Sequence, residues 1–273
     1  KNVFLFNMSN FTDIGLKFDS EEEFYEFIDS QIPKAKTYFP SIPKKPVVLY
    51  EIEFGPGRIF AVMEKKGDEK EELVCFNPGF LGKIFRKFSV SSVYNEDCDY
   101  CFIFEGGMEP QEPVVFSFDE KDLSQLSDKA KSELEEFKAT PPAVGVHFLG
   151  INYLAVCEES LKEGDIIDVN IVGFAHFLQK IAPEKKIHGY FLQTRMVKDE
   201  KEIPPEFYGI CGELKKIEKL ENPLTHNDFF YLVLYQEIVG DIEVVASPEL
   251  VKEDLKKGDI VFAECWLEGM IRK

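Results

Sequence analysis

Two of the six cysteines, Cys98 and Cys101, form a Cys-x-x-Cys pair, a spacing found in zinc half-sites and in thioredoxin-like redox motifs. A structural zinc site needs two further ligands at suitable spacing, and the sequence holds no second pair. A thioredoxin-like motif opens a helix after a strand, whereas this pair follows the turn-like residues Asn95-Glu96-Asp97. We therefore interpret the spacing as coincidental and predict neither a metal ion nor a cofactor.

The histidines do not suggest a catalytic constellation. His147 and His176 stand in the apolar runs Gly-Val-His-Phe-Leu and Phe-Ala-His-Phe-Leu, which are typical of buried structural side chains. No nucleophile lies in a G-x-S-x-G signature, and no glycine-rich nucleotide loop is present. We predict no catalytic residue and favour a binding protein over an enzyme. An enzyme stays open, because residues scattered along a fold leave no local motif.

Alternating ring-bearing side chains near the end of the chain could bind a ligand. In 229–235, which reads Phe-Phe-Tyr-Leu-Val-Leu-Tyr, the second, fourth and sixth residues are apolar and predict an inward-facing set on a strand. The other set, which contains Tyr231 and Tyr235, is then expected to point outward. The same alternation is expected in 261–267, where Val, Ala, Cys and Leu are small enough to fill a barrel interior.

That alternation leaves Phe262 and Trp266 on the outside of the last strand, together with Glu264. Tyr231, Tyr235, Phe262 and Trp266 therefore predict one external aromatic strip, which is the candidate binding site. Such strips stack unpaired bases, receive peptides or dock another part of the same protein.

The composition sets the class of protein. Apolar residues make up 44% of 273 residues and include 26 Phe, so the chain must bury a sizeable core. The formal charge of −18 repels phosphate backbones and anionic lipids, and it suits basic partners or solubility alone. No apolar run reaches about 18 residues, so no membrane span is expected. Most cysteines lie in apolar runs, which predicts reduced thiols and a cytoplasmic protein.

The first half predicts an α+β arrangement. Short strands are expected at 3–6 and 11–18, followed by a helix that Ser20 caps and Glu23 completes as a capping box. Turn residues then divide 50–76 into an antiparallel meander. Further strands are expected at 99–105 and 113–118, and the apolar spacing predicts a helix near 122–138.

Thr140-Pro141-Pro142 halts that helix and predicts a domain boundary. We expect an α+β domain at 1–140 and a β-rich, barrel-like domain at 143–273. The fold class is therefore α+β, mainly antiparallel β.

The end of the chain resembles an OB-fold module of the nucleic-acid-binding type. Over 208–269 the ordered segments are Y-G-I-C-G-E-L-K-K-I-E-K-L, D-F-F-Y-L-V-L-Y, G-D-I-E-V-V-A-S-P-E-L-V and L-K-K-G-D-I-V-F-A-E-C-W-L-E-G. The resemblance covers about a quarter of the chain and implies a five-stranded barrel. Only four strands fall within it. The fifth comes from upstream, with 187–197 as the candidate, or the barrel is incomplete.

A Lys-x-Gly-Asp turn occurs twice, at Gly164-Asp165 and at Gly258-Asp259, each time before a predicted strand. This is either a degenerate internal repeat or a turn that recurs by chance, because Gly-Asp before β-branched residues is common. The sequence alone favours neither of these two explanations over the other.

Two functions follow from these patterns. The first is a non-enzymatic binding protein that presents the aromatic strip to a protein partner, with a basic partner suited to its acidity; an immunity-type inhibitor of a basic toxin is one form. The second is an OB-type binder of single-stranded nucleic acid that uses the strip with Lys215, Lys216 and Lys219. Residues 205–273 hold 14 acidic and 8 basic side chains, a net of −6, which disfavours the second.

Overall fold

A computed structural model of the chain describes ten segments: 10–41, 46–66, 70–95, 99–109, 143–157, 159–182, 190–194, 203–237, 239–252 and 254–272. Several predicted features lie outside these residues. They are the strands at 3–6 and 113–118, the helix at 122–138, the boundary at 140–142 and Cys98.

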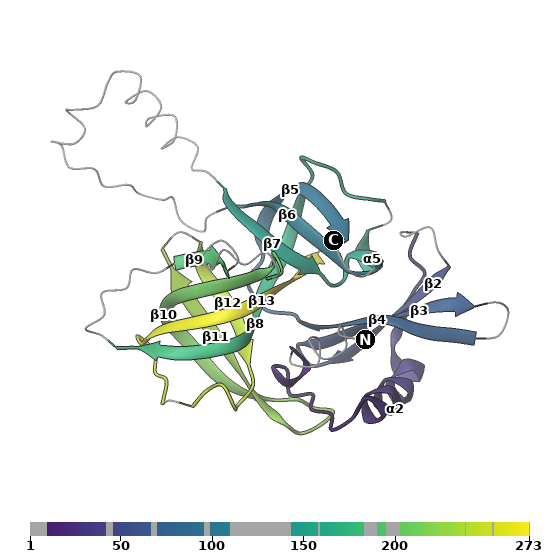
Figure 1. Cartoon of the computed structure of the whole chain (residues 1–273), viewed down its shortest axis with the longest axis horizontal. Coiled ribbons are helices and arrows are strands. Elements are labelled where there is room, and N and C mark those ends of the chain that lie inside the picture. Colours follow the sequence, from purple (N-terminus) through teal and green to yellow (C-terminus); the bar gives the residue numbers. More distant parts are fainter. Residues whose placement is uncertain are drawn as a thin grey trace, which may run out of the picture.

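Near its start the described chain forms a helix that packs on a four-stranded antiparallel sheet (Figure 1). Helix α2 (Glu21–Gln31) is capped by Ser20, whose Oγ accepts a hydrogen bond from the Glu23 amide at 3.1 Å. The predicted cap by Ser20 is therefore confirmed, whereas the Glu23 carboxylate accepts at 2.7 Å from the amide of Asp19, one residue before the cap that a strict capping box would use. Phe24 and Ile28 are the buried residues of the helix. A 3-10 turn, η1 (Ile32–Lys34), follows, and the sheet order is β1 (Lys36–Tyr38), β2 (Val47–Phe54), β3 (Gly57–Lys66), β4 (Lys70–Phe80).

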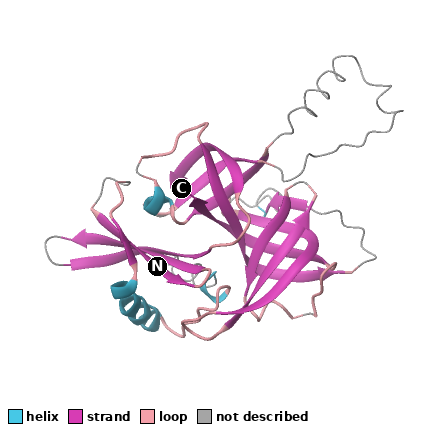
Figure 2. Ribbon diagram, turned by 180° about the vertical axis from the view of Figure 1, so that it is seen from behind, coloured by secondary structure: helices cyan, strands magenta, loops and turns pink. Residues whose placement is uncertain are grey.

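The other strands form one nine-stranded sheet in the order β11–β12–β8–β5–β6–β7–β13–β10–β9, with additional pairings β11–β10 and β8–β13. A short helix, α5 (Tyr153–Val156), lies between β7 and β8. Figure 2 shows these strands from behind. The bounds are β5 (Arg86–Asn95), β6 (Phe102–Met108), β7 (Val144–Gly150), β8 (Ile166–Ile181), β9 (Tyr190–Gln193), β10 (Phe207–Glu221), β11 (Asp228–Gln236), β12 (Gly240–Ala246) and β13 (Ile260–Arg272).

The two additional pairings close the sheet into two rings. The first ring runs β10–β11–β12–β8–β13 and returns to β10. The second runs β5–β6–β7–β13–β8 and returns to β5. Both rings share β8 and β13, which have 16 and 13 residues. Each of these strands is long enough for one part of it to belong to the first ring and another part to the second.

The two rings are built by two halves of the chain with the same arrangement. In each half three consecutive antiparallel strands are followed by a long strand that pairs antiparallel with the first: β8 with β5, and β13 with β10. Each ring is then completed by the long strand of the other half. That strand pairs in parallel with the third strand, as β8 does with β12 and β13 does with β7.

The first Lys-x-Gly-Asp turn has a specific backbone geometry. Gly164 has a φ of 89°, which is in the left-handed region that favours glycine. The Asp165 carboxylate accepts from the Lys162 amide at 2.7 Å. The turn is joined to β5 by two backbone bonds of 2.8 Å, in which Gly164 donates to the Val90 carbonyl and Val90 donates to the Asp165 carbonyl.

The second turn repeats every one of these features. Gly258 has a φ of 94°, and the Asp259 carboxylate accepts from the Lys256 amide at 2.7 Å. Gly258 donates to the Leu214 carbonyl and Leu214 to the Asp259 carbonyl, both at 2.8 Å. A register shift directly after Leu214 matches the one after Val90. The recurring turn is therefore part of an internal structural repeat.

The four-stranded sheet is buried on both faces. On one face Ile52, Ile59 and Ala61 share a core with α2 and with residues of β8, β11 and β12. On the other face Leu49 and Phe60 join the larger core, which contains the inward residues of both rings and of α5. The α2 core is rich in edge-to-face aromatic pairs, the geometry favoured by the ring quadrupole.

A single buried carboxylate connects the four-stranded sheet to the rings. Glu243 on β12 is 1% exposed. Its Oε1 accepts from the Lys83 amide at 2.7 Å and from the Tyr231 hydroxyl at 2.5 Å. Its Oε2 accepts from the Ile84 amide at 3.1 Å and from the Asn170 side-chain amide at 2.5 Å. The link between β4 and β5 is thus held by an ionisable group whose four donors come from three parts of the chain.

Asn170 on β8 completes this junction. Its Oδ1 accepts from the Gly82 amide, and its Nδ2 donates to the Ile84 carbonyl, both at 2.8 Å. Asn170 is fully buried, so these bonds replace the solvation that the side chain loses. A Cβ on Gly82 would overlap the Glu243 carboxylate, so only glycine permits this approach.

Several predictions can be compared with this fold. The mainly antiparallel β character is confirmed, and so are the inward-facing sets of 229–235 and 261–267, because Leu232, Leu234 and Ala263 lie in the larger core. The division into 1–140 and 143–273 is not confirmed. Strands β5 and β6 precede that boundary, yet they hydrogen-bond into the same sheet as the later strands.

Two local predictions are wrong. Residues 11–18 do not form a strand: the chain is helical at 10–12 and turns at 13–15, where Gly15 has a φ of 76°. The fifth strand of the first ring is β8 and not the 187–197 segment. Strand β9, which lies in that segment, pairs with β10 only. A strand is predicted directly after the Gly164-Asp165 turn, but its place in the first ring was missed because it pairs there with strands far along the chain.

Among the helices in the described parts of the chain, none is both long and apolar enough to cross a membrane.

We expect G82A to destabilise the fold by roughly 2 kcal/mol or more, because the new methyl group displaces Glu243 from buried donors. The matched control is G145A in β7, where an added Cβ meets nothing within 4 Å, and which we expect to change stability by less than about 0.5 kcal/mol. Urea unfolding of both variants checks this. Equal midpoints for G82A and the wild type would contradict the proposed role of the Glu243 junction.

Candidate binding face

The predicted aromatic strip lies on the outside of the first ring, but part of it is covered. Tyr231 and Trp266 occupy one row across four strands, in which Tyr231 is opposite Val245, Val245 opposite Phe174, and Phe174 opposite Trp266. The N-terminal part of the chain packs on this row. Phe80 stacks on Tyr231 with ring centres 5.6 Å apart, and Tyr231 is only 4% exposed.

Tyr231 therefore has a clear structural role. Its hydroxyl donates to Glu243, and burial, followed by this hydrogen bond to the carboxylate, raises the pKa of Tyr231. The phenol stays protonated and serves as a fixed donor at the junction. The binding role of Tyr231 stays a prediction, and it would require that Phe80 first be displaced.

Tyr235 lies near the other end of β11 and is half-buried. The Lys215 ammonium is 4.9 Å from the centre of its ring and also 2.9 Å from the Glu213 carboxylate. The ring is thus occupied by a cation–π contact within the chain. Its binding role likewise stays a prediction.

Phe262 and Trp266 belong to a larger group that we call the outer aromatic face. It comprises His176 and Phe177 of β8, Phe207 of β10, and Phe262 and Trp266 of β13. The ring centres of His176 and Phe207 are 5.4 Å apart, those of Phe177 and Phe262 are 5.9 Å apart, and Trp266 lies 6.1 Å from His176. These separations are typical of interacting aromatic pairs.

A local irregularity of β8 brings two consecutive side chains into this face. Glu264 is opposite Phe177 and Cys265 is opposite Ala175, so His176 has no partner residue in the β8–β13 ladder. Such an extra residue is a β-bulge, and it interrupts the strict alternation of inward and outward side chains. His176 and Phe177 can consequently both meet aromatic rings on the outside of the ring.

The face continues across β10 to the edge strand β9. Leu192 is opposite Gly209, Gly209 opposite Glu264, and Glu264 opposite Phe177, so these residues form one row. Leu192 is 48% exposed and Phe177 is 42% exposed. Two large apolar side chains are thus exposed at the ends of one row, with the Glu264 carboxylate between them, and this makes the row the candidate binding face.

His176 is positioned as part of the aromatic packing and not as a base. Its Nε2 is buried and has no hydrogen-bond partner. Burial lowers the pKa of His176, and the nearby Glu264 carboxylate opposes this only in part. The imidazole is therefore neutral near pH 7. Protonation of His176 on acidification can be followed through the fluorescence of the neighbouring Trp266, which is the only tryptophan of the chain.

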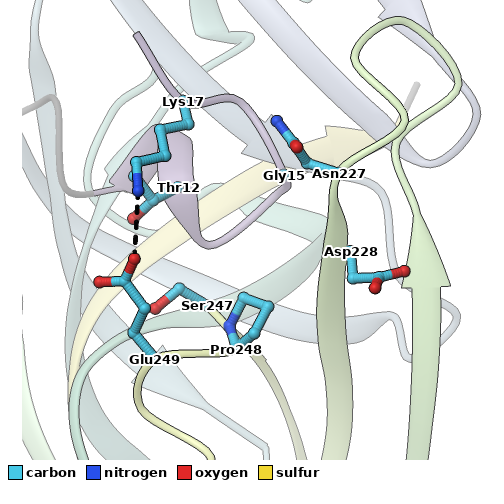
Figure 3. A pocket seen from close by; sticks show the side chains of 8 residues that line it. All are labelled: Thr12, Gly15, Lys17, Asn227, Asp228, Ser247, Pro248 and Glu249. Atoms are coloured by element: carbon cyan, nitrogen blue, oxygen red, sulfur yellow. Dashed lines mark hydrogen bonds and ion pairs between the residues drawn. The ribbon is translucent and has the colours of Figure 1, made fainter. Parts of the chain in front are cut away.

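A small pocket lies elsewhere, at the contact between the N-terminal segment and the ends of β11 and β12 (Figure 3). Its volume is about 210 Å³. The ammonium of Lys17 and the carboxylate of Glu249 pair across it at 3.3 Å, and both side chains are largely exposed. This solvent-screened pair gives little selectivity for a ligand. The lining residues are Thr12, Gly15, Lys17, Asn227, Asp228, Ser247, Pro248 and Glu249.

Within the described residues, no three or more His, Cys, Asp or Glu side chains are arranged to hold a metal ion. His147 lies 3.6 Å from Glu105 through Nε2 and 3.4 Å from Gln193 through Nδ1, on the side of the sheet where β6 and β7 pair. His226 pairs with Glu221 at 2.7 Å on an exposed turn. The neighbours of both histidines in these contacts are carboxylate and amide side chains.

Sequence reasoning missed three residues of this face: Phe177, Leu192 and Phe207. The bulge at His176 breaks the period-two pattern, so alternation along β8 could not have placed Phe177 outside. Phe207 did carry a usable signal. It lies two residues before Gly209 on β10, and the same period places both on the outer side.

Comparisons of the chain with protein-family models, with curated proteins and with solved structures find no match.

We expect the fluorescence of Trp266 to fall on acidification with a midpoint below pH 6.5, the ordinary pKa of histidine. Protonated imidazole quenches a nearby indole, and burial lowers the pKa of His176, which delays its protonation as the pH falls. H176Q should abolish the transition, whereas H226Q should retain it. A midpoint at or above 6.5, or a transition that persists in H176Q, would contradict this account of the face.

Proposed function

We propose that the protein is a non-enzymatic binding protein that engages a basic protein partner through the outer aromatic face. One observation carries the proposal. Exposed Phe177 and Leu192 end a row that crosses four adjacent strands, and the half-buried rings of Phe262 and Trp266 lie beside it. Interface centres are enriched in aromatic residues and are commonly surrounded by a polar rim.

The pairing of the rings supports an OB-type architecture for both. In the first ring, β10 pairs with β11 and β13, and β8 fills the remaining position by pairing antiparallel with β13 and parallel with β12. We infer that this is the strand order of a five-stranded OB barrel whose last strand comes from the other half of the chain. The missing fifth strand of the module at 208–269 is accounted for in this way.

The OB interpretation also bears on the ligand. OB modules bind oligonucleotides on the face of their second and third strands, here β11 and β12. The outward residues Phe229, Tyr231 and Val245 on that face are buried in the α2 core, under the N-terminal part of the chain. The face that could stack bases is therefore used within the protein. This observation favours a protein partner over the alternative, a single-stranded nucleic acid.

The lysines that a nucleic acid would need are also engaged. Lys215, Lys216 and Lys219 lie 2.9, 2.7 and 2.5 Å from the carboxylates of Glu213, Glu218 and Asp228. These pairs neutralise the positive charges next to β11, and the whole chain carries −18. Such a field attracts basic surfaces and speeds their association. An immunity-type inhibitor of a basic toxin is one form that the proposal takes.

The test compares two variants in capture from native lysate. The F177A/L192A variant removes the two exposed side chains at the ends of the row. We expect it to capture at least tenfold less of a partner with a basic isoelectric point than the wild-type protein does. F39A is the matched control, because Phe39 is 75% exposed and lies next to β1, outside the outer aromatic face. Quantitative mass spectrometry of the captured proteins gives the ratio.

Loss of the partner in F39A but not in F177A/L192A would contradict the proposal. The alternative is tested with fluorescent single-stranded oligonucleotides at low ionic strength. We expect no binding that weakens with salt, whereas salt-sensitive binding would support the nucleic-acid function.

A further inference from the structure

We propose that Cys75 and Cys101 are a peroxide-reactive dithiol that closes to a disulfide and cross-links the four-stranded sheet to the second ring. The two sulfur atoms lie 3.4 Å apart. A disulfide bond is about 2.05 Å long, so closure requires the two sulfur atoms to approach each other by little more than 1 Å. The two sulfur atoms therefore start close to bonding distance.

The two cysteines come from different parts of the fold. Cys75 lies on β4 opposite Val62 of β3, in the four-stranded sheet, and belongs to the larger core. Cys101 directly precedes β6, a strand of the second ring. They are 26 positions apart in sequence, and β5 lies between them. A bond between them would hold the sheet and the ring together independently of the Glu243 junction.

The two thiols differ in solvent exposure, and this gives each of them a different role in the reaction. Cys101 is half-buried and Cys75 is buried, so an oxidant in solution reaches Cys101 first. The Asn77 side-chain amide lies 3.6 Å from the sulfur of Cys75 and faces it as a donor. This donor therefore contacts the sulfur that attacks in the second step.

The chemistry balances with a hydroperoxide as the oxidant. The Cys101 sulfur attacks the peroxide, the O–O bond breaks, and a sulfenic acid and one water (or alcohol) form. The Cys75 sulfur then attacks the Cys101 sulfur, the S–S bond forms and the S–O bond breaks. The departing hydroxide takes the thiol proton and leaves as a second water. Two thiols are oxidised by two electrons, and a dithiol reductant reverses the step.

The other described cysteines lack this combination. Burial raises the pKa of the Cys211 and Cys265 thiols, which disfavours the reactive thiolate. Cys157 is half-buried, and the pair of sulfur atoms at 3.4 Å does not include it. The reaction is thus expected to be specific to one pair.

The experiment treats the full-length protein, and a C98S variant, with hydrogen peroxide. Peptide mapping without reduction is expected to show one cross-linked pair, Cys75 with Cys101, lighter by two hydrogens and present in both proteins. The oxidised protein should unfold at a urea concentration higher by roughly 1 M, and dithiothreitol should reverse the shift. C98S keeps the neighbouring cysteine of the Cys-x-x-Cys pair from competing.

Single substitutions distinguish the two steps. C75S should accumulate a sulfenic acid on Cys101 that dimedone traps, while C101S should form neither the adduct nor the cross-link. Absence of a Cys75–Cys101 cross-link under peroxide would overturn the proposal, and so would a dominant Cys98–Cys101 bond in the wild-type chain. The mapping of the wild type and C98S decides this even where a serine variant fails to fold.

Discussion

The buried carboxylate of Glu243 is the interaction on which the rest of the structure depends. It accepts hydrogen bonds from the backbone amides of Lys83 and Ile84, the side-chain amide of Asn170 and the hydroxyl of Tyr231. A carboxyl group in a 1% exposed position needs such hydrogen-bond donors to replace the water that it loses. The junction fixes the β4–β5 link against β8 and β12, and it thereby holds the four-stranded sheet over the aromatic row of the first ring.

The internal repeat explains how a mostly β-stranded chain leaves few exposed sheet edges. Each half builds four strands, and the long strands β8 and β13 each serve both rings. Exposed edges invite pairing with other chains, and ring closure removes them. The same sharing makes the halves interdependent, because neither ring closes without a strand from the other. The predicted division into an early and a late domain is not confirmed, because β5 and β6 pair into the same sheet as the later strands.

The sequence predicts what depends on local periodicity and fails where long-range pairing decides. Ser20 and Glu23 correctly predict the start of helix α2, and the alternation in 229–235 correctly predicts which side chains of β11 face the core. The position of β8 in the first ring could not be predicted, because β8 pairs with strands that lie some 70 to 100 residues later. Tyr231 shows how far the sequence could predict the candidate binding site. Period two places it outside the ring correctly, but only the tertiary structure shows that Phe80 covers it.

Amide hydrogen exchange at Lys83 and Ile84 tests the Glu243 junction most directly. Both residues lie outside helices and strands, so their amides would exchange rapidly without a protected acceptor. The account predicts that they are protected to the level of the β12 amides, and that E243A removes the protection at both positions. Exchange at the rate of an exposed loop in the wild-type protein would show that Glu243 does not hold the sheet to the rings.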